Sequence, residues 1–237
     1  MGSTYGSQIV TSGLTLLLDV SNINSYRGAG STWVDQAQGL LFTSTGATQT
    51  PYTKKNGVQC FDFNGSGYWQ CTNGFSQVDM GGDCTLMFWL YSESVPIRKT
   101  IFQKDGTVYA SYEQEIAVTW EAANSGFSYY SRYNAYDYAG IAAGNLNAWN
   151  MFALKMSTGK TTAARTGFYS VNGASWTSSY TSRSSTALVA AGPIIVGAGY
   201  AGVVDVGYIN SVYCYNKMLT DAEIAQNYNA LRKKFSV

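Results

Sequence analysis

Five Asn-Gly or Asp-Gly dipeptides divide the chain into short segments, and they constrain the fold more than any other feature of the sequence. They are Asn56-Gly57, Asn64-Gly65, Asn73-Gly74, Asp105-Gly106 and Asn172-Gly173. Each supplies residues that tolerate positive φ, as a two-residue hairpin turn requires. With 25 glycines but only 3 prolines in 237 residues, the sequence predicts many short strands joined by tight turns.

The segments between these turns have the composition of β-strands. Residues 85–91 (TLMFWLY) are apolar at successive positions, which predicts a central strand buried on both faces. Residues 206–215 have bulky side chains on both faces and predict one long strand. Residues 58–63 and 68–71 flank Asn64-Gly65-Ser66-Gly67, and we expect them to form a hairpin. Further strands are predicted at 116–120, 149–156, 168–171 and 194–196.

One segment near the C-terminus is typical of a helix. Thr220 and Glu223 have the spacing of a capping box, in which each side chain bonds the backbone N–H of the other residue. Ile224, Tyr228 and Leu231 then fall on one face, and the basic residues 232–234 would lie at the negative end of the helix dipole. The sequence therefore predicts a helix over 221–233.

Many strands followed by one helix indicate an all-β fold, an antiparallel two-sheet β-sandwich with one short C-terminal α-helix. No internal repeat or linker divides the chain. We expect residues 1–12 to be a lead-in segment and residues 13–237 to be a single domain.

Composition excludes several classes of function. Only 12% of the residues are charged and the net charge is +1, so we expect no nucleic-acid or membrane partner. The absence of histidine excludes histidine triads and histidine zinc sites.

Without a secretory signal or an apolar run of about 20 residues, we expect synthesis in a cytoplasm. The four cysteines form no CxxC motif and are predicted to be buried free thiols.

Several short motifs follow one another along the chain. They are Leu14–Asp19, the loop Asn24–Asp35 (NSYRGAGSTWVD), Phe61–Gly65, Thr85–Trp89, Tyr169–Gly173, Ile194–Gly197, Gly207–Ile209 and Tyr213–Asn229. Together they resemble the concanavalin A-like, laminin-G-like jelly-roll domains of tailed-bacteriophage virion proteins. Their order covers most of residues 14–235, while residues 92–147 match poorly. The resemblance implies a jelly roll and a virion origin, and it does not define a ligand.

Related folds include glucanases with paired carboxylates on one strand, so we considered Glu113, Glu115 and Glu121 as catalytic residues. Residues i and i+2 of a strand share a face about 6.6 Å apart, within the roughly 5–9.5 Å that glycoside hydrolysis uses. However, positions 117 and 119 are Ala and Thr, so the remaining family acid is missing. We expect no catalytic residues and no enzymatic activity.

Calcium is common in laminin-G-like relatives, and it prefers clustered oxygen ligands. Asp62 with Asn64, or Asp79 with Asp83, could contribute such ligands. Neither pair has the acid density of a dedicated calcium loop. We therefore predict no metal residues and no cofactor, with calcium as the open alternative.

The most unusual stretch contains five tyrosines within ten residues. Its candidate residues are Tyr129, Tyr130, Arg132, Tyr133, Tyr136 and Tyr138. Rigid amphipathic rings with adaptable polar neighbours are typical of protein-binding surfaces. Tyrosine rings also stack on sugars, and they can simply pack within a sandwich. We expect an interface or ligand-binding site here, with simple packing and glycan binding as the alternatives.

These observations predict a non-enzymatic virion structural protein, most simply a capsid decoration or head-associated protein. Its expected partners are other virion proteins and further copies of itself in a homo-oligomer. The alternative is a carbohydrate-binding adhesin domain of a phage tail or fibre protein, which would contact a host surface glycan. A glucanase-like hydrolase is the least favoured hypothesis.

Overall fold

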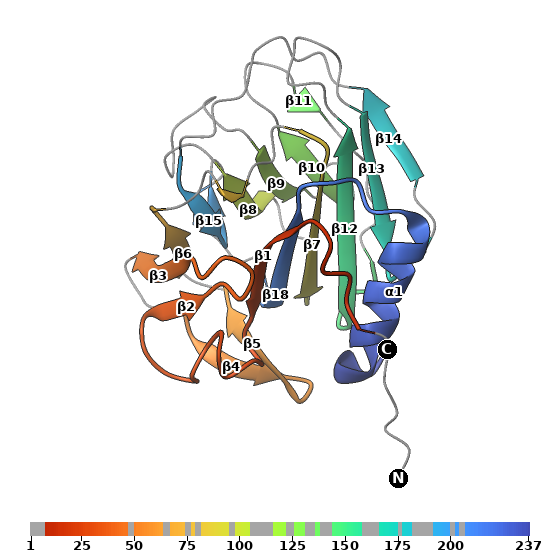
Figure 1. The fold of residues 1–237 in the computed structure, drawn as a ribbon. Helices are drawn as coiled ribbons and strands as arrows, with labels where there is room; N and C mark the ends of the chain where they lie inside the picture. The colour runs from red at the N-terminus through yellow and green to blue at the C-terminus, as the bar shows by residue number, and fades with distance from the viewer. Residues whose placement is uncertain are drawn as a thin grey trace.

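Two antiparallel sheets face each other in the computed structural model, with a helix on the outer side of one of them (Figure 1). The structure describes residues 8–46, 50–63, 67–73, 77–78, 82–94, 98–104, 116–121, 126–130, 136–137, 144–157, 166–174, 177–181, 192–199, 202–203 and 207–237. All strand pairings between these residues are antiparallel, as predicted for a two-sheet sandwich.

The first sheet, sheet A, has β7 and β18 at its centre. In spatial order its strands are β14 (Thr177–Thr181), β13 (Thr166–Val171), β12 (Trp149–Ser157), β7 (Cys84–Tyr91), β18 (Tyr208–Tyr215), β5 (Val58–Asp62) and β4 (Tyr52–Lys55), and β1 (Leu14–Asp19) also pairs with β18. A short connection, β16 (Ala198–Gly199) with β17 (Gly202–Val203), forms a separate two-stranded sheet.

The second sheet, sheet B, ends at a two-residue strand. Its order is β11 (Tyr136–Asp137), β10 (Gly126–Tyr130), β9 (Ile116–Glu121), β8 (Arg98–Lys104), β15 (Ile194–Val196), β6 (Gly67–Cys71), β3 (Leu41–Gly46) and β2 (Thr32–Val34). The chain then finishes in α1 (Asp221–Leu231) and the 3₁₀ helix η3 (Arg232–Phe235).

Strand β7 is buried on both faces, as its apolar sequence predicts. Leu86, Phe88 and Leu90 belong to the core between the two sheets. Met87 and Trp89 belong to a second apolar cluster between sheet A and the C-terminal helices. A strand that alternates apolar and polar residues could not be buried on both faces, since one of its faces would be polar.

The capping box predicted at the start of α1 is present. The Thr220 hydroxyl accepts a hydrogen bond from the Glu223 amide, and the Glu223 carboxylate accepts one from the Thr220 amide. Ile224 is buried against sheet A, and Tyr228 stacks on Trp89 with ring centroids 6.0 Å apart. The predicted apolar face of the helix therefore faces the second cluster.

The helix ends earlier than predicted. It stops at Leu231, and residues 232–235 form η3 instead of a further α-helical turn. Phe235 stacks on Trp89 at 3.8 Å, and Lys234 pairs with Asp19 at 2.8 Å. These two anchors hold the tighter turn, so the basic residues do not form the last turn of α1.

The hairpin predicted around Asn64-Gly65-Ser66-Gly67 is wrong, although both of its strands exist. Strand β5 belongs to sheet A, where it pairs with β18 and β4, whereas β6 belongs to sheet B, where it pairs with β3 and β15. The connection therefore crosses between the sheets, and Phe61 and Trp69 meet in the core with ring centroids 4.7 Å apart. A glycine-rich segment permits either path, and the long-range pairing of β5 with β18 decides between them.

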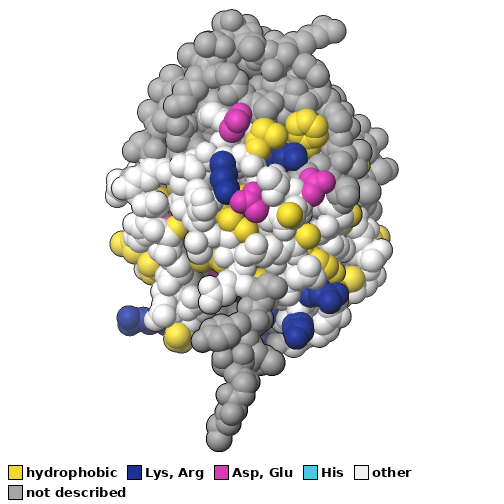
Figure 2. Space-filling view, turned by 45° about the vertical axis from the view of Figure 1, so that its right-hand side comes forward, with side chains coloured by type: hydrophobic (Ala, Val, Ile, Leu, Met, Phe, Trp, Pro, Cys, Tyr) yellow, Lys and Arg dark blue, Asp and Glu magenta, His cyan; other side chains and the backbone are white. Residues whose placement is uncertain are grey.

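The four cysteines are buried and free, as predicted. No helix in the described part of the chain is long and apolar enough to cross a membrane. Figure 2 shows one face of the molecule, on which the described charged side chains are few and both signs are interspersed.

Candidate functional site

The tyrosine-rich stretch contributes two strands to the edge of sheet B. Strand β10 pairs with β9 on one side and with β11 on the other, and β11 is the last strand of the sheet (Figure 1). The backbone register places Tyr130 opposite Tyr136 and Tyr129 opposite Asp137. The fold therefore brings Tyr130 and Tyr136, six positions apart in sequence, to one cross-strand pair.

The register also divides the tyrosines between the two faces of the sheet. Tyr129 is opposite Val118, which is fully buried in the core between the sheets. Tyr130 is opposite Ala117, the next position along β9. Because cross-strand partners share a face and successive residues alternate, positions 130 and 136 belong to the outer face and position 129 to the core face.

Three of the candidate residues, Arg132, Tyr133 and Tyr138, lie outside the described residues, as do Glu113 and Glu115. Glu121 is in β9 at the register position opposite Arg98 and Gly126. The interface hypothesis and the rejection of catalysis at Glu113 and Glu115 both stay predictions.

The loop motif at residues 24–35 has a structural role. Asp35 is 1% exposed, and its carboxylate accepts hydrogen bonds from the amides of Leu17, Ala37 and Gln38 at 2.6–3.0 Å. Ser25 donates to the Val34 carbonyl, and the Tyr26 hydroxyl donates to the Gly30 carbonyl. These polar groups stabilise the loop, and both carboxylate oxygens of Asp35 accept backbone N–H donors.

The calcium hypothesis rests partly on residues that the structure does not describe. Asp62 is half-buried in β5 and Asp83 is exposed just before β7, whereas Asn64 and Asp79 lie outside the described residues. Among the described residues, no group of three or more acids or cysteines gathers as metal ligands. Calcium binding stays an open alternative.

The sequence analysis missed a cluster of polar and aromatic groups at one end of sheet A. The Lys55 ammonium bonds the Glu93 carboxylate and lies 4.7 Å from the Tyr208 ring centroid and 5.0 Å from that of Tyr91. The hydrogen bond to Glu93 raises the pKa of Lys55, so the side chain stays cationic. Burial raises the pKa of Tyr208. These residues come from three segments far apart in the sequence, at 55, 91–93 and 208, so no local sequence signal could have found the cluster.

Comparison with protein families supports the fold. The model of a laminin-G-like family, described as the concanavalin A-like lectin/glucanases superfamily, matches residues 63–225, well over half of the chain. The chain belongs to this family. The resemblance to concanavalin A-like, laminin-G-like jelly rolls is thereby confirmed. A search of curated proteins found no match.

Solved structures share this concanavalin A-like fold at low sequence identity. Trypanosoma rangeli sialidase aligns with a TM-score of 0.60 and 14% identity, over 99% of this chain and 37% of its own. Domain 4 of a GH43 extracellular arabinanase from Geobacillus stearothermophilus, in complex with arabinotriose, aligns with a TM-score of 0.57 and 13% identity, over 92% of this chain and 98% of its own. The botulinum neurotoxin type G receptor binding domain aligns with a TM-score of 0.57 and 11% identity, over 92% of this chain and 51% of its own.

These likenesses show the fold alone. The chain spans just over a third of the length of the sialidase, so it corresponds to one part of that enzyme. It aligns with the arabinanase domain over almost the whole of that domain. The concanavalin A-like domain is thus a unit that other proteins combine with further domains.

Proposed function

We propose that this concanavalin A-like domain is a non-enzymatic virion structural protein, displayed on the particle surface and attached to other virion subunits through the β9–β11 edge of sheet B. The observation that carries the proposal is the Tyr130–Tyr136 cross-strand pair at the end of the sheet. Tyrosine is enriched in protein interfaces because one ring buries apolar area and presents a hydroxyl.

The position of this pair supports an attachment role. An edge strand has unpaired backbone groups that another chain can complete, and β11 is the terminal strand of sheet B. The low charge of the chain, 12% of its residues, also favours close contact, because charged groups are costly to desolvate.

The contacts of three described acids support a non-enzymatic role. Asp35 accepts three backbone amides, Asp19 pairs with Lys234, and Glu223 caps α1 and pairs with Lys217. Each of these carboxylates has structural partners. We therefore expect no cleavage of β-glucan or alginate-type substrates, and cleavage that is lost in Glu115→Gln would contradict the proposal.

Antibody labelling of purified virions tests whether this chain lies on the particle surface. An antibody against this chain, imaged on negatively stained particles, should decorate the particle surface at regular positions. Particles that carry no label, while the free protein is recognised, would contradict a virion location.

A second candidate function is glycan binding by the same tyrosine-rich edge. The arabinotriose complex of the arabinanase domain favours it, because that domain has this fold over nearly its whole length. A glycan array probed with the intact chain distinguishes the two functions. Retention of a glycan that is lost in Tyr130→Ala with Tyr136→Ala would support binding, and an array without signal would contradict it.

A further inference from the structure

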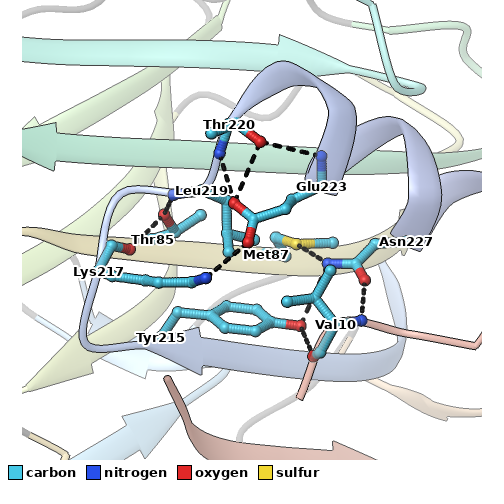
Figure 3. Close-up of polar contacts among 9 residues, drawn as sticks. All are labelled: Val10, Thr85, Met87, Tyr215, Lys217, Leu219, Thr220, Glu223 and Asn227. Carbon is cyan, nitrogen blue, oxygen red and sulfur yellow. Dashed lines mark hydrogen bonds and ion pairs between the residues drawn. The ribbon is translucent and has the colours of Figure 1, made fainter. Parts of the chain in front are cut away.

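A short N-terminal segment, Gln8–Val10, is bound by side chains from the opposite end of the chain. The Val10 amide donates to the Asn227 side-chain oxygen at 2.7 Å, and the Tyr215 hydroxyl donates to the Val10 carbonyl at 3.0 Å. In addition, the Gln226 side-chain amide donates to the Gln8 carbonyl at 2.7 Å. Figure 3 shows Val10 beside Tyr215 and Asn227, between β18 and α1.

The two residues that bind Val10 form a site with fixed orientation. Tyr215 and Asn227 are fully buried. The Asn227 side-chain nitrogen donates to the Tyr215 hydroxyl oxygen at 3.2 Å and contacts the Met87 sulfur at 3.3 Å. This arrangement turns the Asn227 oxygen and the Tyr215 hydroxyl hydrogen toward Val10, one as acceptor and one as donor.

Such a pair matches the backbone of an extended peptide. A peptide unit presents one N–H donor and one C=O acceptor, and Val10 uses both of its groups here. If the segment left, a buried acceptor and a buried donor would lose their partners, and such unsatisfied groups are costly. The Val10 side chain adds apolar contact, since it is 8% exposed within the second cluster.

The segment is joined to the sandwich by an exposed connection. Thr11 and Ser12 are exposed, and Gly13 has a φ of +79° just before β1. The turn is held by a hydrogen bond from the Leu14 amide to the Thr11 carbonyl. The Gly13 carbonyl accepts a hydrogen bond from the Asn216 amide at 2.8 Å. A rotation at Thr11 and Ser12 would therefore redirect Gln8–Val10 and leave Gly13 and β1 in place.

We propose that the Tyr215–Asn227 site is a docking site for an extended peptide and that neighbouring copies of this chain exchange their Gln8–Val10 segments through it. The Gln8–Val10 segment of a second copy has the same sequence as the chain's own segment. It can therefore make the same hydrogen bonds to Tyr215 and Asn227. With a net charge of +1, copies repel each other little.

The exchange depends on crowding. A tethered segment reaches its own site at an effective concentration of about a millimolar, so dilute copies keep their own segments. Copies held side by side in an assembly reach similar local concentrations, and exchange then links neighbours while the contacts at the Tyr215–Asn227 site stay the same. The exchange does not involve the tyrosine-rich edge, since the two surfaces use different residues.

Two complementary full-length variants test this exchange. The acceptor copy carries Val10→Asp, which expels its own segment, and Gln226→Cys on α1. The donor copy carries Asn227→Ala, which frees its segment, and Gln8→Cys. Because the native cysteines are buried, a short thiol-specific cross-linker should react at the introduced thiols. The product that reports exchange is the heterodimer that joins position 8 of the donor to position 226 of the acceptor.

We expect the mixture to give a cross-linked heterodimer whose yield rises with protein concentration. A donor that also carries Val10→Asp should give several-fold less, because a buried charge cannot occupy the site. Thr11→Asp, with the same charge at an exposed position, is the matched control and should change nothing. Circular dichroism of each variant verifies that it is folded.

Two outcomes would overturn the proposal. Equal heterodimer yields from the donor with and without Val10→Asp would show random collision of exposed thiols. An absence of heterodimer at millimolar concentration, from folded variants, would show that the segment binds only within its own chain.

Discussion

Asp35 shows at the scale of single residues how this sandwich accommodates a buried charge. Three backbone amides, from Leu17, Ala37 and Gln38, surround its carboxylate. These contacts join β1 to the loop before β3, and they explain why an acid follows Trp33 in the loop motif. The sequence marked this loop as a family signature, but only the hydrogen bonds show that the acid is structural.

We therefore expect Asp35→Ala to lower the free energy of unfolding by about 3 kcal/mol, because three backbone amides lose a charged acceptor. Urea denaturation followed by tryptophan fluorescence measures this change. Gln38→Ala is the control, since that side chain is exposed, and should stay within about 0.5 kcal/mol of wild type. Equal effects of the two substitutions would refute the structural role of the carboxylate.

Buried thiols and phenols predict alkaline destabilisation. Burial raises the pKa of Cys60 to about 12, and it also raises the pKa values of Cys214, Tyr213 and Tyr215. In the unfolded chain these groups ionise near their ordinary values, about 8.5 for Cys and 10 for Tyr. Above about pH 9 the unfolded state therefore binds fewer protons than the native state, and stability falls as pH rises.

Urea denaturation at pH 7, 8, 9 and 10 checks this sign. The free energy of unfolding should be nearly constant up to pH 8 and should then fall. The native protein should also react with thiol reagents at pH 8 only after denaturant is added. Stability that increases up to pH 10, or rapid reaction of native thiols, would contradict this account.

At the scale of elements, α1 depends on its first turn for its place on sheet A. The capping box fixes the start of the helix, and Lys217 bonds Glu223 at 2.6 Å from the preceding turn. The Thr85 hydroxyl donates to the Lys217 carbonyl at 2.8 Å and accepts from the Leu219 amide at 3.0 Å (Figure 3). The helix start is therefore tied to β7.

Thr220→Ala should lower the free energy of unfolding by about 1 kcal/mol, because one amide of the first turn loses its acceptor. Thermal and urea denaturation measure the loss, and Thr220→Ser should restore most of it. If the alanine and serine variants are equally stable, the hydroxyl does not cap the helix.

Local chemistry predicted some elements and not others. The capping box predicted α1, and Asn56-Gly57 predicted the β4–β5 turn, where the φ angles are 49° and 81° and Lys55 is opposite Val58. The glycine-rich segment 64–67 predicted a hairpin that does not form, because β5 pairs with β18, far away in sequence. Turn residues specify local backbone angles, and long-range pairing specifies which sheet a strand joins.

The candidate site likewise combines features that the local sequence predicts with features that only long-range pairing decides. Composition was sufficient to select the tyrosine-rich stretch, whereas its division between two faces follows from the register with Val118. The Lys55 cluster could not be predicted, because Lys55, the segment 91–93 and Tyr208 lie far apart in the sequence.

At the scale of the whole molecule, the two sheets separate the tyrosine-rich edge from the C-terminal helices. Figure 1 shows β11 at the top, and the C-terminus and the lower part of α1 at the bottom. The proposed attachment edge and the Tyr215–Asn227 site are therefore distinct surfaces. A domain with two such surfaces can attach to a particle through one and contact a neighbouring copy near the other.

The central claim is that the Tyr130–Tyr136 pair attaches this domain to a particle. The direct test is the binding of the purified chain to particles that lack it, compared between wild type and Tyr130→Ala with Tyr136→Ala. Central tyrosines in interfaces contribute about 2 kcal/mol each. Because such contributions are not additive, the double variant should bind at least about a hundredfold more weakly while keeping its circular dichroism spectrum.

Tyr133→Ala with Tyr136→Ala should also weaken binding of the chain to these particles. The matched control is Ile23→Ala with Leu41→Ala, which removes apolar side chains that are 65% and 59% exposed elsewhere, and it should bind like wild type. Particle occupancy as a function of chain concentration is the measurement. A loss of about two decades in the tyrosine variants alone is the predicted result, and undiminished occupancy would contradict the claim.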